Sequence, residues 1–277
     1  MEIKKRFVKN YLVENFDVSR AKKDLFKGKI LILQNSNKIF DLVSTIKKIF
    51  FEFFKMSVDE FISNNSIDFN ETKIVKFQKN IKESNKIRQK FKKILQNLSF
   101  DVVDTYCDRI TFRFNPSLNQ EPTGLLKPAT LHRDTWASNF QHQINWWIPL
   151  HNVTTDNTIY FVPNYFNRKT KNDTSKWNYE LYKEGKKSKS TPVSTYKPKE
   201  EEIFSTKLDY GQILIFSGNH LHGSKIGHRR RLNIETRTLC SKDPKHYKLP
   251  RNVDNESLLI KRYKWFKSLN NSKFYSD

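Results

Sequence analysis

The chain has 277 residues, of which 36% are hydrophobic and 14% aromatic, and its formal net charge is +22. This length suits one domain with helical additions, and the composition can bury a core, which excludes a wholly disordered chain. No apolar run approaches the roughly 18 residues of a spanning helix, and we expect no secretory signal at the basic N-terminus. Two cysteines without a CxxC motif exclude a disulfide framework or zinc ribbon and predict reduced thiols in a cytoplasmic protein.

The positive charge is concentrated in the flanks of the chain. Residues 1–100 carry a net +11, residues 167–200 a net +6 and residues 201–277 a net +7, whereas residues 101–166 carry −2. Such flanks favour an anionic partner, which would be a nucleic acid, a membrane surface or a phosphorylated substrate. The alternative is composition alone, because many Lys, Asn and Ile residues with few alanines are typical of an AT-rich genome.

The first hundred residues are predicted to be helical apart from one strand. This strand covers residues 26–33 and is entered through a turn at Gly28. Apolar residues spaced three and four apart predict a core-packed helix over 37–55 and a second, longer helix over 71–98 with one solvated side.

From residue 103 the hydrophobic period changes to two, which indicates β-strands. The polar, Lys-rich residues 167–200 interrupt the pattern and predict an excursion or a lid, and residues 255–269 predict a closing helix. The predicted strands cover residues 109–114, 143–150, 158–162, 211–218 and 231–239.

Helices followed by many short strands predict a mostly β fold with a helical buttress. We expect one domain over residues 1–277, with a helical part and the first strand in 1–100 and an antiparallel barrel or jelly roll over 103–240. Residues 241–277 are expected to close the barrel with helix.

A pattern of metal ligands stands in the central part of the chain. On an extended strand His132 and Asp134 would point to the same face, and a predicted buried strand leads directly to His220 and His222. Two His and one carboxylate form the facial triad of non-haem Fe(II) oxygenases. His220 is the rival of His222, zinc competes for the same ligands, and a surface strand end is the alternative for His132 and Asp134.

The last predicted strand has one polar face. Arg231, Asn233, Glu235 and Arg237 alternate there with residues 232, 234 and 236, so this face is either solvent-exposed or lines a polar barrel interior. A planar guanidinium can hold a carboxylate through two parallel hydrogen bonds, and this is the expected role of Arg231. Arg237 is expected to lie deeper, where it pairs Glu235 or contacts an anionic substrate, and Arg113 is a candidate for the same pocket.

Residues 103–240 resemble the Fe(II)/2-oxoglutarate-dependent dioxygenases, and among these the phytanoyl-CoA dioxygenase-like branch. The family fold is a double-stranded β-helix, which agrees with the predicted jelly roll. The loop Pro163-Asn164-Tyr165-Phe166 departs from the Pro-Gly-Ser-His of the family. The matching pieces are His132-x-Asp134, Asn145-Trp146-Trp147-Ile148-Pro149-Leu150, Phe161-Val162-Pro163, and Leu221-His222-Gly223-Ser224 with Arg231.

This resemblance implies a role for each matching residue. It assigns iron to His132, Asp134 and His222, and the carboxylate of 2-oxoglutarate to Arg231. Trp147 and Ser224 match positions that contact 2-oxoglutarate. Asn233 replaces the Ser of the family's Arg-x-Ser pattern, so an amide would take over the role of the hydroxyl.

The implied activity is hydroxylation of an unactivated C–H bond. The implied cofactors are Fe(II), 2-oxoglutarate and O2, with ascorbate as a reductant that keeps the iron ferrous. The presence of Asp134 favours hydroxylation over halogenation, because halogenases of this class lack that carboxylate.

The substrate is predicted to be an anionic small molecule, sugar or lipid, since the flanks are basic. The layout also resembles bacterial hydroxylases of the Kdo sugar of lipid A, so a cytoplasmic location with peripheral contact to the inner membrane face is expected. Two alternatives stay open, a basic module that binds nucleic acid or protein and a non-redox cupin-like metalloprotein, although no specific nucleic-acid-binding motif is present.

Overall fold

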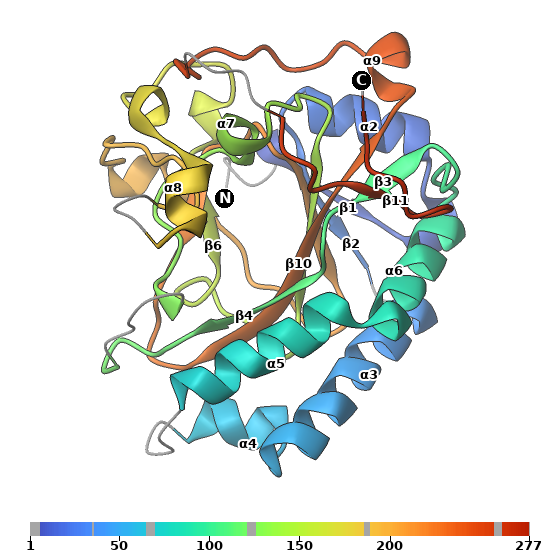
Figure 1. The fold of residues 1–277 in the computed structure, drawn as a ribbon, viewed down its shortest axis with the longest axis vertical. Helices are drawn as coiled ribbons and strands as arrows, with labels where there is room; N and C mark the ends of the chain where they lie inside the picture. The colour runs from blue at the N-terminus through green and yellow to red at the C-terminus, as the bar shows by residue number, and fades with distance from the viewer. Residues whose placement is uncertain are drawn as a thin grey trace.

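Two β-sheets form the core of the molecule (Figure 1). The computed structural model describes residues 6–34, 36–64, 70–120, 126–185, 189–257 and 262–276. The larger sheet has the strand order β1-β2-β8-β5-β10-β3-β11, with β4 also paired to β10, and the smaller has the order β7-β6-β9. The larger sheet contains β1 (Val8–Tyr11), β2 (Ile30–Leu33), β3 (Thr105–Cys107), β4 (Thr111–Asn115), β5 (Ile144–Pro149), β8 (Ile213–Ser217), β10 (Arg231–Cys240) and β11 (Lys267–Ser268). The smaller sheet contains β6 (Ile159–Phe161), β7 (Phe204–Ser205) and β9 (His222–Ser224).

Between β4 and β10 the chain crosses several times between the two sheets. After β4 in the larger sheet, the chain makes a bridge at His132 to β9, then returns to the larger sheet as β5. It crosses to the smaller sheet for β6 and β7, returns as β8, crosses again as β9 and ends in β10. The chain has the double-stranded β-helix fold. This confirms the fold that the sequence predicts.

The central strands of the larger sheet are buried on both faces. Every residue of β5 and β8 is buried, because one face of the sheet lies under helices and the other faces the barrel interior. Strand β10 pairs with β5 on one side and with β3 and β4 on the other. This register places residues 231, 233, 235 and 237 on a common face, as the alternating pattern predicts.

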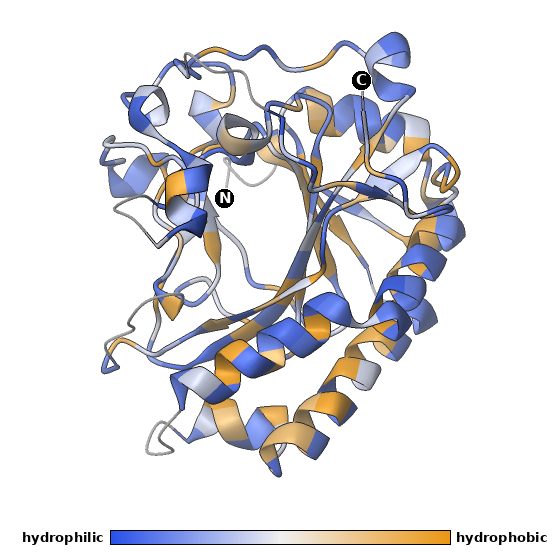
Figure 2. Ribbon diagram, in the orientation of Figure 1, coloured by the Kyte–Doolittle hydropathy of each residue, from blue (hydrophilic) through white to orange (hydrophobic). Residues whose placement is uncertain are grey.

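Five helices among the described N-terminal residues buttress this sheet. Figure 1 shows α3 and α6 on one side of β10 and β6 on the other. Their apolar residues form one core with the sheet, and Figure 2 shows apolar and polar stripes along α3, α5 and α6. The structure contains no described helix that is long and apolar enough to cross a membrane. The five helices are α2 (Val18–Phe26), α3 (Asn37–Phe54), α4 (Val58–Ser63), α5 (Glu71–Glu83) and α6 (Asn85–Asn97).

Two N-terminal predictions are wrong in their boundaries. The single helix over 71–98 is two helices, because Ser84 leaves the helical region and its side chain accepts a hydrogen bond from the backbone of Ile87 as an N-cap. The strand over 26–33 begins only at Ile30, since Phe26 still belongs to α2 and Gly28 turns the chain at φ +89°.

The helix predicted over 255–269 is also wrong for the residues that the structure describes there. Residues 255–257 and 262–266 are irregular, and Lys267–Ser268 forms β11, which pairs with β3. Phe266 packs on Phe140 and Leu239 at the end of the barrel, so tertiary packing overrides the helical spacing. Between residues 241 and 277 the described helix is α9 (Asp243–His246). The remaining short helices include α7 (Asp134–Ser138) and α8 (Tyr179–Lys183), the latter within the excursion 167–200, of which residues 186–188 lie outside the described residues.

Candidate metal centre

An isolated antiparallel bridge between the loop at His132 and the start of β9 brings His132 and His222 together. The backbone N–H of His132 donates to the carbonyl of His222 at 2.8 Å, and the N–H of His222 donates to the carbonyl of His132 at 2.9 Å. Residues directly opposite in an antiparallel pair extend their side chains to the same side, and the two imidazole centroids are 4.3 Å apart.

Asp134 completes the cluster from the first turn of α7. Arg133 between the ligands has extended backbone, and the short helix then begins at Asp134, so the expected extended strand covers only part of the motif. The carboxylate lies 3.8 Å from Nε2 of His132 and 3.6 Å from Nε2 of His222. One ligand atom from each of the three residues lies within 4.8 Å of the others. The structure therefore brings together the three ligands that the sequence predicts.

The hydrogen bonds of both imidazoles leave Nε2 free to bind a metal. Nδ1 of His132 lies 2.7 Å from the carbonyl of Thr130, and Nδ1 of His222 lies 2.9 Å from the carbonyl of His220. A carbonyl only accepts, so each Nδ1 carries the proton and each Nε2 presents its lone pair toward Asp134. Burial, with the neighbouring His132, lowers the pKa of His222 to about 4 and keeps this imidazole neutral at pH 7.

Charge at the site keeps the carboxylate ionised. Burial alone would raise the pKa of Asp134, but the two imidazoles, Arg237 and the Asn145 amide outweigh burial and lower it. Two imidazoles and one carboxylate on one side of a buried site fit a divalent transition metal with open coordination positions. The three side chains are therefore suitable ligands for iron.

His220 is not part of this cluster. Its side chain is 1% exposed, and its ring nitrogens lie 3.0 Å from the carbonyl of Ser217 and 3.2 Å from that of Gly28. Both nitrogens thus have backbone partners on the turns behind the barrel. The choice of His222 over its rival agrees with the geometry.

Arg231 is the centre of a second buried polar site. Its Nη2 donates to Oδ1 of Asn115 at 2.7 Å and to Oγ of Ser224 at 3.2 Å, and its Nε donates to Oδ1 of Asn233 at 3.2 Å. The guanidinium carbon lies 5.5 Å from the ring centroid of Trp147. The four residues that the sequence assigns to the co-substrate therefore converge. Asn115 was missed, although its position as the polar end of the strand 109–114 was a usable signal.

This site contains a buried cation without an acidic partner. Among the described residues, no carboxylate lies within 4.0 Å of the guanidinium of Arg231, and burial lowers its pKa to about 10. The side-chain N–H groups of Asn115 and Asn233 are buried and also lack a hydrogen-bond acceptor. A buried charge and buried donors are costly unless they are satisfied, so the site fits an anion with several acceptor oxygens, such as a carboxylate.

Arg113 and Arg237 lie on the same barrel face but are already paired. Nε of Arg113 lies 2.6 Å from Oε1 of Glu235. Arg237 pairs with Asp108 through Nε and Nη2, with the Nε bond at 2.9 Å, and not with Glu235. Asp108 is in reach because its backbone N–H donates to the carbonyl of Arg237 where β3 meets β10. Glu235 and Asp108 therefore compensate the positive charge of the two arginines that the sequence predicts to contact an anionic substrate.

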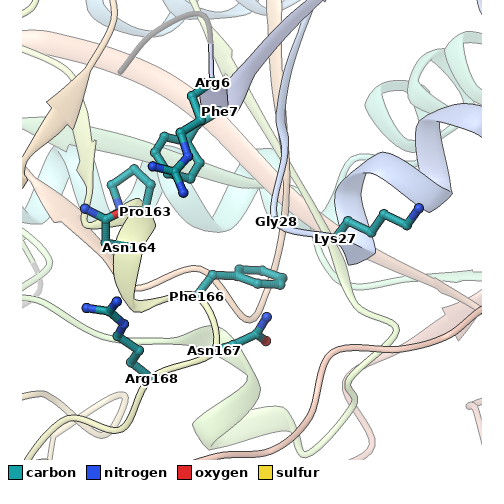
Figure 3. Close-up of a pocket in the computed structure, with 9 residues that line it drawn as sticks. All are labelled: Arg6, Phe7, Lys27, Gly28, Pro163, Asn164, Phe166, Asn167 and Arg168. Atoms are coloured by element: carbon teal, nitrogen blue, oxygen red, sulfur yellow. The ribbon is translucent and has the colours of Figure 1, made fainter. Parts of the chain in front are cut away.

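A separate cleft of about 380 Å³ is lined by residues 6–7, 27–28, 163–164 and 166–168 (Figure 3). Its lining includes Arg6, Lys27 and Arg168, and Figure 3 shows Phe166 at its centre. None of the predicted metal ligands lines this cleft.

Comparison with known proteins gives matches among solved structures. No protein-family model and no curated protein matches the chain. EvdO2 from Micromonospora carbonacea var. aurantiaca, complexed with 2-oxoglutarate, is 8% identical with a TM-score of 0.48 over 81% of this chain and 92% of that one. EctD from S. alaskensis with bound Fe is 11% identical with a TM-score of 0.42 over 90% and 82%.

A third match is to SnoN from nogalamycin biosynthesis, a non-haem α-ketoglutarate-dependent epimerase. It is 13% identical with a TM-score of 0.34, and the chain spans about half of that protein, with 55% of this chain and 53% of that one covered. These proteins are described with iron, 2-oxoglutarate or α-ketoglutarate, the groups that the sequence resemblance implies. Since all three TM-scores are below 0.5, function is inferred below from the side chains of the site.

Proposed function

We propose that the protein is a non-haem Fe(II)- and 2-oxoglutarate-dependent oxygenase that hydroxylates a C–H bond of its substrate. The observation that carries this proposal is the joint presence, in one barrel, of the His132–Asp134–His222 cluster and the buried Arg231, which has no carboxylate within 4.0 Å among the described residues. Ser224 links the two sites, because it lies two residues beyond His222 on β9 and accepts a hydrogen bond from Arg231.

Each site has its own task in this reaction. His132, Asp134 and His222 hold the ferrous ion through two imidazole nitrogens and a carboxylate. Arg231 holds the distal carboxylate of 2-oxoglutarate, and the free amide N–H groups of Asn115 and Asn233 offer two further donors. When bound, iron and 2-oxoglutarate supply the oxidising power that activates dioxygen toward a C–H bond. Trp147 covers the guanidinium and keeps water from it.

The substrate reaches the centre from the side of Asp134. The side chain of Asp134 is 18% exposed, against 8% for His132 and 9% for His222, and Arg237 beside it is 24% exposed. The barrel face on this side carries charges of both signs, since Arg113 is paired with Glu235 and Arg237 with Asp108. The prediction of an anionic or lipid-linked substrate, such as Kdo, therefore depends on the basic flanks of the chain and stays a prediction.

Reconstitution of activity tests the proposal. Metal-free protein is supplied with Fe(II), 2-oxoglutarate and O2, and succinate is measured against Asp134→Ala and His220→Ala variants. We expect succinate release that needs Fe(II) and is lost in Asp134→Ala but kept in His220→Ala. Equal succinate in all three proteins would contradict the assigned metal ligands, and none with wild type across a broad set of substrates would leave a non-redox metalloprotein as the better explanation.

A further inference from the structure

Asp134 is supported from below by two residues that face each other across the sheet. Asn145 on β5 and Arg237 on β10 are direct partners in the antiparallel register. Their side chains therefore share the inner face of the sheet. Each contacts a different oxygen of the Asp134 carboxylate, Asn145 on Oδ2 and Arg237 on Oδ1.

The amide of Asn145 has a fixed orientation. Its Nδ2 donates to Oδ2 of Asp134, while its Oδ1 accepts a hydrogen bond of 2.8 Å from Nε2 of Gln143. Gln143 is fully buried, and its amide packs on the backbone of Gly218, where an added Cβ would lie 2.8 Å from Nε2. The hydrogen bond from Gln143 to Oδ1 of Asn145 orients this amide so that its Nδ2 donor faces the carboxylate of Asp134.

Arg237 is held on its other sides. Nη1 lies 3.7 Å from Oδ1 of Asp134, while Nε and Nη2 are bound to Asp108. The ring of Trp265 lies 5.1 Å from the guanidinium carbon, and Phe266 lies 5.8 Å from it. The guanidinium is therefore kept in its plane by aromatic contact and a carboxylate, with one edge left for Asp134.

Asp134 needs such support because its own element is short. It begins the five-residue helix α7, whose N-cap residue makes no side-chain capping hydrogen bond. Hydrogen-bond partners behind a metal ligand fix its rotamer, and their loss typically reduces metal affinity by about 10- to 100-fold.

We propose that Asn145 and Arg237 are positioning residues that hold the carboxylate of Asp134 in its metal-binding orientation. This inference rests on the proposed function, because it assumes that the cluster binds a metal. It extends the proposed function to two residues that act through Asp134 and not on the metal itself. The order of support is Gln143 to Asn145 to Oδ2 on one side, and Asp108 to Arg237 to Oδ1 on the other.

The test is an anaerobic calorimetric titration with Fe(II) alone. It is carried out on wild type, Asn145→Leu and Arg237→Met. Arg113→Met is the matched control, because it removes the same charge from the same face while its pairing is to Glu235. We expect the dissociation constant for Fe(II) to be about 10- to 100-fold higher in Asn145→Leu and Arg237→Met, and in the control to stay within about twofold of wild type. Melting temperatures measured without metal identify any variant that fails to fold.

A third variant, Trp265→Leu, changes a half-buried residue whose ring contacts the guanidinium of Arg237, and it is expected to weaken Fe(II) binding several-fold. Wild-type affinity in Asn145→Leu and Arg237→Met would overturn the inference, and so would an equal loss in Arg113→Met. If Asn145→Leu does not fold, Arg237→Met and Trp265→Leu decide. Absence of Fe(II) binding by wild type would overturn the proposed function together with this inference, whereas wild-type binding with unaffected variants would overturn the inference alone.

Discussion

Replacing Arg231 with Leu should remove most of the affinity for 2-oxoglutarate. Arg231 is 2% exposed and its guanidinium has no carboxylate within 4.0 Å among the described residues, so the bound dicarboxylate would supply its counter-charge. Breaking a buried ion pair by deleting one partner costs about 3–5 kcal/mol, because the other charge stays buried and unpaired. At about 1.4 kcal/mol per tenfold, this predicts a loss of roughly a hundred- to several thousand-fold in affinity.

The assay is anaerobic titration of the Fe(II)-loaded protein with 2-oxoglutarate, read by the metal-to-ligand absorption band. Arg229→Leu is the control, because it removes an exposed arginine that lies two residues before Arg231. Thermal unfolding gives an independent readout, since a ligand at 100 times its dissociation constant stabilises the folded state by about 2.7 kcal/mol, and Arg231→Leu should not show this stabilisation. An unchanged dissociation constant in Arg231→Leu would refute the reasoning and move the co-substrate carboxylate to another cation.

Three further predictions concern the metal and stability. Asp134→Ala should lose Fe(II) binding while His220→Ala keeps it, and calorimetry that shows the reverse would contradict the ligand set. Burial lowers the pKa of His151 to about 4 against an ordinary value of about 6.5, so the unfolded state binds the extra proton and stability falls as pH drops through this window. Between pH 7 and pH 5 the free energy of unfolding in urea should fall by about 2 kcal/mol less in His151→Gln than in wild type. An equal fall in both proteins would contradict this role of His151. Lys22→Met should destabilise by about 3–5 kcal/mol, since it leaves Asp243 buried and unpaired, and an unchanged urea midpoint would exclude that role for the pair.

The metal ligands could be predicted from the sequence because spacing and strand context restrict them. His132 and Asp134 are two residues apart, and His222 follows a run of apolar residues that could only be a buried strand. The bridge between His132 and His222 then brings the two segments together. Arg231 could be predicted for a similar reason, since alternation on β10 turns it to the inner face.

The residues behind these groups could not be predicted, because their roles depend on register and on loops. Asn145 stands within an apolar strand, but only its pairing opposite Arg237 shows that it reaches Asp134. Asp108 pairs with Arg237 because it lies in the short connection between β3 and β4, and no periodic pattern predicts this position. Ser84 divides a continuous helical pattern with a single N-cap hydrogen bond. Each of these features depends on a single side-chain contact, to which the hydrophobic period is insensitive.

The most direct test of the central claim is the binding stoichiometry of Fe(II) and 2-oxoglutarate in the absence of oxygen. Wild-type protein is titrated first with Fe(II) and then with 2-oxoglutarate, and Asp134→Ala is treated in the same way. We predict one Fe(II) per chain, one 2-oxoglutarate per bound metal, and neither in Asp134→Ala. Binding of Fe(II) without any binding of 2-oxoglutarate, or binding of both by Asp134→Ala, would contradict the proposed oxygenase.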